Sequence, residues 1–364
     1  MKMFLRCILI LLSSIYITWQ DNKPPKELSR KEDMALYEKN LKEDVIPKDA
    51  IELKLIKKVP EKNEIEDKEI FFRNLLYIFV DERGHIFAPD PTLCVIYEFD
   101  EYGKYFNRYS KQGQGPGELR HPQRIYFYKN ENIVMDPMQS RLTYFNKKWE
   151  YQRSVSLFGK YAVGVDNDGN IYCKNIREEN IISVLDGNGK FIRSFGRLLY
   201  PEKSNSILNT FIAAIAPNGT VWVGFQAVGI IRKYTKEGKL EKEINIMDYS
   251  NKYLKNKLEQ NIENDKKNKR TLFIVVKGIV PINEEIIVTR GGMVSMIFRI
   301  DSKGQYEKTY YVPPKYRADR VCSHVRMSEN GEEIFYVHEY DSDEDSDHSI
   351  GIYGRGKYKE NWRR

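Results

Sequence analysis

The sequence predicts an all-β fold, a six-bladed β-propeller of four-stranded antiparallel blades, and the first evidence is the spacing of its tight turns. Four times a short apolar run ends in a Gly or Asn turn, and a second such turn follows 19 to 21 residues later. About twenty residues hold two strands and the loop between them, so two hairpin turns at this separation define a four-stranded unit. The paired turns are Gly84 and Gly103, Gly169 and Gly189, Gly219 and Gly238, and Asn283 and Gly304.

The second observation is that these units recur along the chain. The first turns fall at Gly84, Asn130, Gly169, Gly219, Asn283 and Gly331, with a mean step of about 49 residues. This step is near the roughly 40 to 50 residues that a propeller blade occupies. Six turns therefore predict six blades, whose bodies we place at residues 72–112, 120–158, 160–196, 210–244, 271–311 and 321–355.

Composition agrees with a single β-rich domain. The 364-residue chain contains 25 Tyr and 17 Phe, residues that favour strands, and the repeat extends over nearly all of it. The net charge of +7 is a small excess of 59 basic over 52 acidic residues. A nucleic-acid-binding protein needs a focused basic stripe, so we expect no nucleic-acid partner and interpret the charges as solvated surface.

The N-terminus resembles an export signal. Residues 1–6 include two basic side chains, Lys2 and Arg6, and residues 7–17 form an apolar run that is too short to span a bilayer comfortably. We therefore expect a signal peptide or an uncleaved anchor over residues 1–20, no other integral membrane segment, and a periplasmic, cell-surface or secreted protein. Residues 21–50 are charged, with a weak helical pattern at 31–41, and are predicted to form a tether.

One strand precedes the first blade. Residues 51–57 alternate apolar and polar side chains, as a half-buried strand does. A propeller pairs its two ends to remove exposed strand edges. We therefore predict that residues 51–59 close the ring beside residues 349–353, and that the propeller covers residues 51–358.

A helical insertion is predicted between the fourth and fifth blades, at about residues 248–270. Its apolar residues recur at nearly helical spacing among Lys, Asn and Glu. The insertion accounts for the longest step between two blades. The apolar residues are Tyr253, Leu254, Leu258 and Ile262.

The loop before the second blade resembles a known family. Gly113-Gln-Gly-Pro-Gly-Glu-Leu119, followed by Pro122 and a strand at 125–128, is similar to the connection between blades in bacterial six-bladed propellers of the NHL-repeat and TolB-like group. The match is specific to this loop and the second blade, where Asp136, Gln139, Arg141 and Phe145 follow the NHL pattern. The resemblance implies a fold used for protein binding, ligand sensing and, in some relatives, lyase or lactonase chemistry with a channel metal.

Metal and nucleophile motifs are sparse. A metal site in the channel needs His, Asp or Glu side chains from several blades, and only His121, His324 and His338 can be expected to meet near one face. The acidic run at 341–347 lacks the Gly and Glu of an EF-hand, so we predict a solvated hairpin loop, with loose calcium binding as the alternative. No Gly-x-Ser-x-Gly elbow is present. We predict no cofactor, and Ca²⁺ or Zn²⁺ would belong to an alternative function.

The ligand is expected at the face that carries the irregular loops. The connections between blades and the loops between second and third strands emerge on this loop-rich face, and the glycine hairpins emerge on the opposite one. Loops that vary are more often used for binding than scaffold turns are. The candidate ligand-binding residues are Arg120, His121, Asp136, Gln139, Arg141, Arg177, Gln226, Arg290 and His338. Asp136 and Arg141 have an alternative interpretation, in which they pair with each other across one hairpin.

Three hypotheses follow for function. The first is an exported, non-enzymatic propeller that binds a protein or a glycan through the loop-rich face. The alternative is a metal-dependent lyase or hydrolase with its site in the central channel. A third is an envelope assembly component held in place by residues 21–49.

Overall fold

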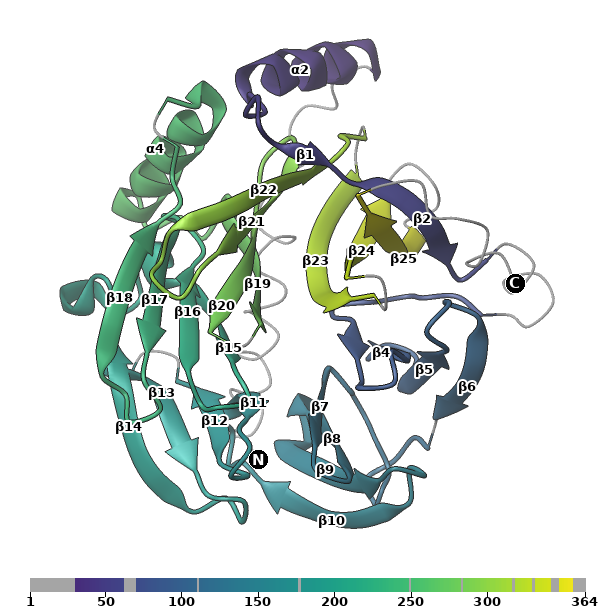
Figure 1. Ribbon diagram of the computed structural model, residues 1–364. Coiled ribbons are helices and arrows are strands. Elements are labelled where there is room, and N and C mark those ends of the chain that lie inside the picture. The colour runs from purple at the N-terminus through teal and green to yellow at the C-terminus, as the bar shows by residue number, and fades with distance from the viewer. Residues whose placement is uncertain are drawn as a thin grey trace.

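The six-bladed propeller is confirmed. The computed structural model describes residues 30–61, 70–109, 111–175, 178–248, 250–282, 284–315, 318–328, 331–341 and 347–355. Six sheets stand around a central channel, and consecutive strands within each blade pair in an antiparallel manner (Figure 1). The predicted turn residue Asn283, the candidate Arg177, the export signal at residues 1–20 and most of the acidic run lie outside the described residues.

Each blade takes four strands, with the first strand nearest the channel. The first blade holds β3 (Phe79–Val80), β4 (Ile86–Asp90), β5 (Val95–Phe99) and β6 (Tyr105–Tyr109), and the second holds β7 (Arg124–Tyr128), β8 (Glu131–Asp136), β9 (Arg141–Asn146) and β10 (Tyr151–Ser156). The third holds β11 (Tyr161–Val165), β12 (Ile171–Lys174), β13 (Asn180–Leu185) and β14 (Phe191–Arg197), and the fourth holds β15 (Phe211–Ile215), β16 (Val221–Phe225), β17 (Ile230–Tyr234) and β18 (Leu240–Asn245). The fifth holds β19 (Val276–Ile282), β20 (Glu285–Arg290), β21 (Ser295–Ile300) and β22 (Tyr306–Val312), and the sixth holds β23 (Ala318–Met327), β24 (Glu333–Asp341) and β25 (Asp347–Gly354).

The ring closes as predicted, through the N-terminal strand. β2 (Lys54–Val59) pairs with β25 in an antiparallel manner and becomes the outermost strand of the sixth blade. The predicted closing segment begins three residues earlier, and there the outcome differs. β1 (Ile51–Glu52) runs parallel to β22 at the edge of the fifth blade. The N-terminal segment therefore joins two neighbouring blades.

Five of the repeated glycine hairpins are Asp-x-x-Gly turns, whereas the turns at Gly219, Gly238 and Gly331 begin at Ala216, Thr235 and Ser328. At the first of the five the Asp81 carboxylate accepts hydrogen bonds from the backbone N–H groups of Arg83 and His85, both at 3.0 Å. Gly84 takes a φ of 85°, which glycine adopts without the steric cost of a Cβ. At these five turns an aspartate three residues before the glycine therefore stabilises the turn that the glycine spacing marks. The same carboxylate bonds recur at Asp100, Asp166, Asp186 and Asp301.

Apolar side chains pack between adjacent blades and hold the ring together. Trp222 of β16 is fully buried in a cluster that also includes Ile286 and Val288 of the next blade. Inner strands approach one another closely at the channel. A Cβ on Gly164 of β11 would lie 2.3 Å from Cγ1 of Ile215 on β15, so this contact requires glycine.

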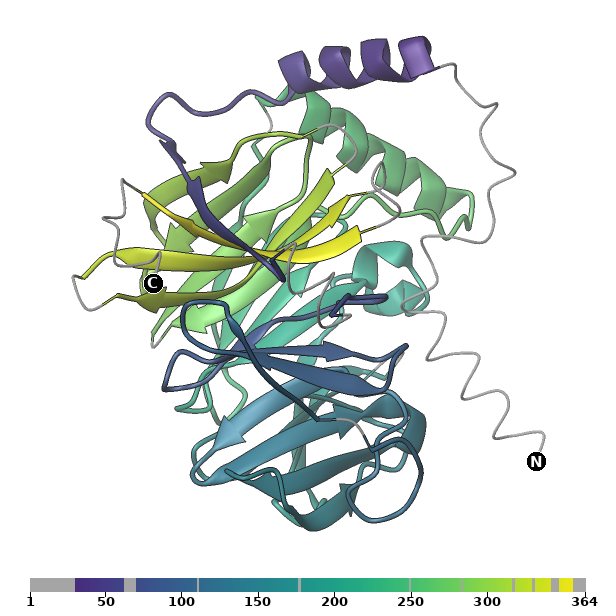
Figure 2. The same cartoon turned by 90° about the vertical axis from the view of Figure 1, so that its right-hand side faces the viewer.

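Two α-helices lie at the edge of the propeller among the described residues. α4 (Lys252–Lys266) is the predicted insertion, and the Asn251 side chain caps it by accepting from the Leu254 N–H. α2 (Arg30–Glu43) lies beside α4 (Figure 2). Three 3-10 turns are η1 (Pro137–Gln139), η2 (Pro201–Lys203) and η3 (Ile207–Asn209). Neither described helix is long and apolar enough to cross a membrane.

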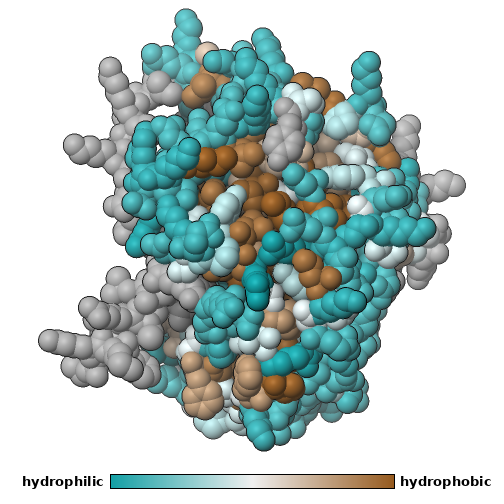
Figure 3. All heavy atoms as spheres, turned by 90° about the vertical axis from the view of Figure 1, so that its left-hand side faces the viewer, coloured by the Kyte–Doolittle hydropathy of each residue, from teal (hydrophilic) through white to brown (hydrophobic). Residues whose placement is uncertain are grey.

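The surface around α4 is mainly hydrophilic. Figure 3 views the molecule from the side on which α4 lies and shows apolar side chains gathered near the centre of a polar surface. Elsewhere on the outer strands single apolar side chains are exposed, among them Phe191 on β14 and Leu240 on β18. Isolated exposed apolar residues are ordinary for a globular protein.

Candidate functional site

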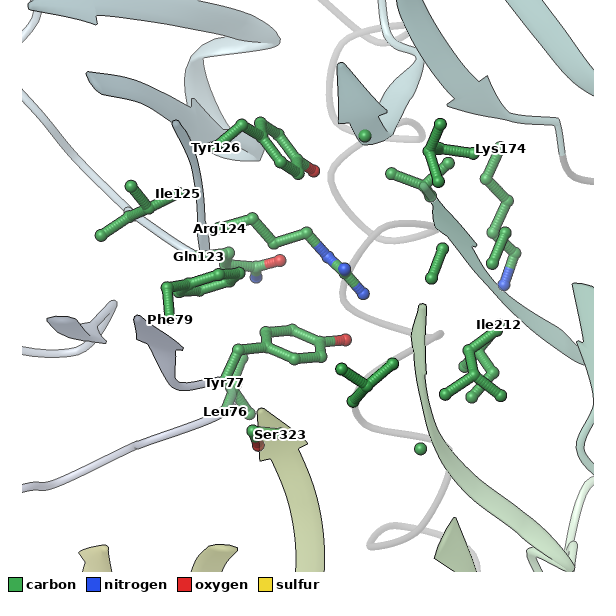
Figure 4. Close-up of a pocket in the computed structure, with 18 of the residues that line it drawn as sticks. Leu76, Tyr77, Phe79, Gln123, Arg124, Ile125, Tyr126, Lys174, Ile212 and Ser323 are labelled. Carbon is green, nitrogen blue, oxygen red and sulfur yellow. The ribbon is translucent and has the colours of Figure 1, made fainter. Parts of the chain in front are cut away.

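A cavity of about 700 Å³ occupies the central channel and is lined by residues of all six blades (Figure 4). Apolar side chains such as Val163, Ile215 and Ile279 form much of its wall. Each inner strand begins at the loop-rich face, so side chains at the start of these strands lie at that end of the cavity. Arg124 opens β7 and Tyr161 opens β11, which places both near the mouth that faces the irregular loops.

Arg124 is the central polar group of the cavity. Its guanidinium stacks over the ring of Tyr77, with 4.0 Å between the guanidinium carbon and the ring centroid. Its Nε donates to the Tyr161 hydroxyl at 3.2 Å, and that hydroxyl donates to Gln123 Oε1 at 2.9 Å. Burial alone lowers the pKa of Arg124, but the neighbouring tyrosines outweigh it and the pKa is raised. Arg124 therefore stays charged, as arginine does in proteins.

Lys174 supplies a second positive charge from the third blade, next to the blade that carries Arg124. It is the last residue of β12, and Figure 4 shows it beside the same cavity as Arg124. Its Nζ donates to the Phe211 carbonyl and lies 4.3 Å from the centroid of the Phe211 ring. Burial, followed by the charge of Arg124, lowers the pKa of Lys174 to about 8. The amine is thus mostly protonated at pH 7.

Among the described residues, these two charges have no acidic partner. None of the described residues that line the cavity is Asp or Glu. In the part of the chain that the structure describes, neither Arg124 nor Lys174 forms an ion pair with a carboxylate. Lys277, which also lines the cavity, differs because it pairs with Asp319. The cavity consequently has a positive end within mainly apolar walls.

The three histidines that sequence analysis grouped do not form one site. His121 and His324 line the cavity, and burial lowers the pKa of both, that of His324 to about 4. His338 instead lies on β24 with its Nε2 3.0 Å from Nδ1 of His348. Within the described ranges, no group of three or more His, Cys, Asp or Glu side chains could hold a metal ion.

The residues that carry the family resemblance fasten the glycine-rich loop. Asp136 is fully buried and accepts from the Arg120 N–H and from Gln139 Nε2, both at 2.7 Å. Arg141 donates to the carbonyl of Glu118 at 2.7 Å. Asp136 and Arg141 occupy opposite positions in the hairpin register but are each bonded to other groups, so the alternative ion pair between them is absent from the described contacts.

The remaining candidates are spread over different environments. Gln226 lines the cavity and donates to the Val276 carbonyl at 3.3 Å. Arg120 contributes its backbone N–H to the bond with Asp136. Arg290 is buried in an ion pair with Asp44, at 2.8 Å. Of the nine candidates, the structure places His121 and Gln226 in the cavity wall.

The two charged residues of the cavity, Arg124 and Lys174, were not among the predicted candidates. The available signal was a charged residue at the end of a short apolar strand, since Arg124 begins the run Ile125-Tyr-Phe-Tyr128 and Lys174 ends the run beginning at Ile171. Such a charge at the end of a buried strand can mark a polar site. Tyr77 precedes the first inner strand and carries no comparable signal.

Comparison with known proteins identifies similar structures but no family. No protein-family model matches the chain, and no curated protein sequence matches it. A protein of Bacteroides fragilis provisionally named an exported protein shares 14% identity at a TM-score of 0.53, over 86% of this chain and 97% of the other. The calcium-binding protein regucalcin of Agrobacterium tumefaciens shares 11% identity at a TM-score of 0.51, over 85% and 98%. This likeness shows the fold alone. The NHL and TolB-like resemblance stays a prediction.

The buried histidines lead to a prediction on acid stability. An unfolded histidine binds its proton near pH 6.5, whereas burial, followed by His348, lowers the pKa of His338 to about 3. The unfolded state therefore binds more protons between these values, and the free energy of unfolding falls with decreasing pH by up to about 1.4 kcal/mol per unit for such a group. We expect His338→Gln to flatten this slope in urea unfolding at successive pH values. Equal slopes for the variant and the original protein would contradict the assignment.

Proposed function

We propose that this protein is an exported, non-enzymatic binding protein that takes a glycan ligand into its central cavity from the loop-rich face. The observation that carries the proposal is the cavity of about 700 Å³, built from all six blades. Pockets of about 300–1,000 Å³ enclose small-molecule ligands. Its size favours a short oligosaccharide over a folded protein, which would reach only the rim.

The chemistry of the cavity supports a sugar ligand. Tyr77, Tyr126 and Phe211 line it. Arg124 covers one face of the Tyr77 ring and Lys174 covers one face of the Phe211 ring, and the apolar face of a sugar ring can pack on the aromatic surface that remains. Gln123, Gln226 and Ser323 add polar groups that can bond hydroxyls. A mainly apolar wall with a few polar groups at one end is typical of ligand pockets.

Binding is favoured over catalysis by the side chains present. Glycoside hydrolysis commonly uses a pair of carboxylic acids on either side of the scissile bond. The described residues lining the cavity include no such acid. We therefore propose that the protein binds its ligand without hydrolysing a glycosidic bond.

The export part of the proposal depends on the N-terminal pattern. A basic start followed by an apolar run at residues 7–17 is typical of a signal. The similar Bacteroides fragilis protein is itself provisionally named as exported. A polysaccharide-derived ligand outside the cytoplasm is consistent with both observations.

Filling the cavity should weaken binding. Ser323 lies on the inner strand β23 and lines the cavity, so Ser323→Trp places an indole in the ligand's space. Gln152→Trp is the control, because Gln152 is exposed on the outer strand β10. With an oligosaccharide that binds the original protein, we expect Ser323→Trp to weaken binding at least about tenfold in isothermal titration calorimetry, equivalent to about 1.4 kcal/mol. Equal affinities in the two variants, with unchanged melting temperatures, would place the ligand outside the cavity.

A further inference from the structure

We infer that the glycan is acidic and that its carboxylate is bound by Arg124, with Lys174 providing a second positive charge. This inference rests on the proposed function, because it names the class of ligand for the same cavity. The two side chains come from neighbouring blades and lie beside the same cavity, as Figure 4 shows. Arg124 lies close enough to Lys174 for its charge to contribute to the lowered pKa of the amine.

Charge balance favours an anionic ligand. Charged side chains withdrawn from water are normally paired, because an unpaired charge in a medium of low dielectric constant is costly. Arg124 and Lys174 are both half-buried in the channel, and the described residues offer them no carboxylate. An anionic ligand group would provide the missing counter-charge. A neutral sugar would leave both charges unpaired in a site emptied of water.

The geometry of the Arg124 guanidinium suits a carboxylate. Only the Nε of Arg124 has a hydrogen-bond partner among the described residues, the hydroxyl of Tyr161. The two terminal nitrogens are thus open to the cavity, while the ring of Tyr77 supports the face of the group. Two parallel N–H donors on a rigid plane match the two oxygens of a carboxylate.

A second arginine in the chain shows what the usual arrangement looks like. The guanidinium of Arg153 also stacks on a tyrosine, at 3.5 Å from the ring centroid of Tyr144. Arg153, however, lies 3.7 Å from the Glu131 carboxylate and donates to the carbonyl of Gly187 at 2.9 Å. Stacking on an aromatic ring is therefore common to both residues, and the missing acidic partner distinguishes Arg124.

Cavity size argues for a sugar acid over an inorganic anion. Sulfate or phosphate would fill only a small part of about 700 Å³, and the aromatic and apolar walls would then have no ligand atoms to contact. A uronic acid unit places a carboxylate beside a ring that can pack on Tyr77, Tyr126 or Phe211. Carboxylate and sulfate are both anions whose oxygens accept hydrogen bonds from arginine, so binding of free sulfate must be measured for comparison.

The test compares acidic and neutral disaccharides. Calorimetry of the purified full chain would use the uronic acid disaccharides of galactose, glucose and mannose, each beside its neutral counterpart, and sodium sulfate. We expect at least one acidic disaccharide to bind about tenfold more tightly than its neutral partner, a preference that added salt weakens. Arg124→Gln should remove the preference and Lys174→Met should reduce it. Arg153→Gln is the matched control and should leave it unchanged.

Each failure has its own signature. If acidic and neutral disaccharides bind equally and Ser323→Trp blocks both, the inference is wrong and the proposed function stands. If sulfate alone binds as tightly as the acidic disaccharides, the site holds an inorganic anion and the inference is overturned. If no acidic disaccharide binds at millimolar concentration, the inference also fails. If disaccharides bind and Ser323→Trp has no effect on their affinity, both the inference and the proposed function are wrong.

Discussion

Replacing Asp44 by alanine is expected to lower the free energy of unfolding by about 3–5 kcal/mol, the cost of breaking a buried ion pair from one side. The Asp44 carboxylate lies 2.8 Å from the Arg290 guanidinium, and the two side chains are 0% and 3% exposed. Arg290 would remain charged without its partner, because arginine does not lose its proton in proteins. Urea unfolding followed by circular dichroism measures the effect.

Asp44 also bonds other elements, which adds to the expected loss. It accepts from the Asn251 side chain at 2.9 Å and from the Val294 N–H at 3.1 Å. Asp44 directly follows α2, and its carboxylate thus connects the end of this helix to Asn251, which caps α4, and to the fifth blade. Removing it would leave a buried amide and a buried N–H without a partner in addition to the charge.

The matched control is Glu38→Ala, which removes an exposed carboxylate from α2 itself. We expect a change within about 0.5 kcal/mol, as for most surface substitutions. The double variant Asp44→Leu with Arg290→Met removes both charges and should recover much of the stability, because no unpaired charge remains. Similar losses for Asp44→Ala and Glu38→Ala would show that the pair does not hold the segment in solution.

The fold was predictable because its signals are local. A Gly turn with positive φ, such as Gly84, is fixed by a few neighbouring residues, and its recurrence counts blades directly. The closing role of residues 54–59 also followed, because a propeller with an unpaired edge strand is exposed to aggregation. The pairing of residues 51 and 52 with the fifth blade could not be predicted from the sequence, because it depends on the path that the chain takes between blades.

The candidate site was less predictable, because it is assembled across blades. Arg124 and Lys174 are fifty residues apart in the sequence, and they face one cavity only through the arrangement of two blades around the channel. Which residues of an inner strand face the channel depends on strand register. A shift of one residue in the register would turn every side chain of the strand to the other side. Analysis of the loops selected Asp136 and Arg141, whose bonds fix the glycine-rich loop in place.

The acidic partner of Arg290 illustrates the same limit. The charged segment at residues 21–50 indicated a tether, with a weak helical pattern at 31–41. Nothing local distinguishes Asp44 from the exposed acids around it, because its burial comes from α4 and the fifth blade, more than two hundred residues later. Long-range contacts of this kind give no short sequence pattern.

Val59→Asp is expected to cost more than about 4 kcal/mol, because it places an unpaired charge in the packing that closes the ring. Val59 ends β2, is 0% exposed and packs in one cluster with Ile350 and Ile352 of β25 and with residues of the first blade. A loss of this size is a large share of the roughly 5–15 kcal/mol that stabilises a typical folded protein. Denaturant unfolding would then begin at much lower urea concentration.

Lys58→Asp provides the control on the same strand. Lys58 is exposed and directly precedes Val59, so its side chain points to the opposite side of the strand. Both substitutions introduce aspartate with its low strand propensity and leave the backbone pairing with β25 available. Their difference therefore measures burial in the closing blade. Comparable losses from the two variants would mean that β2 does not seal the sixth blade, and the ring would have to be held by contacts between blades alone.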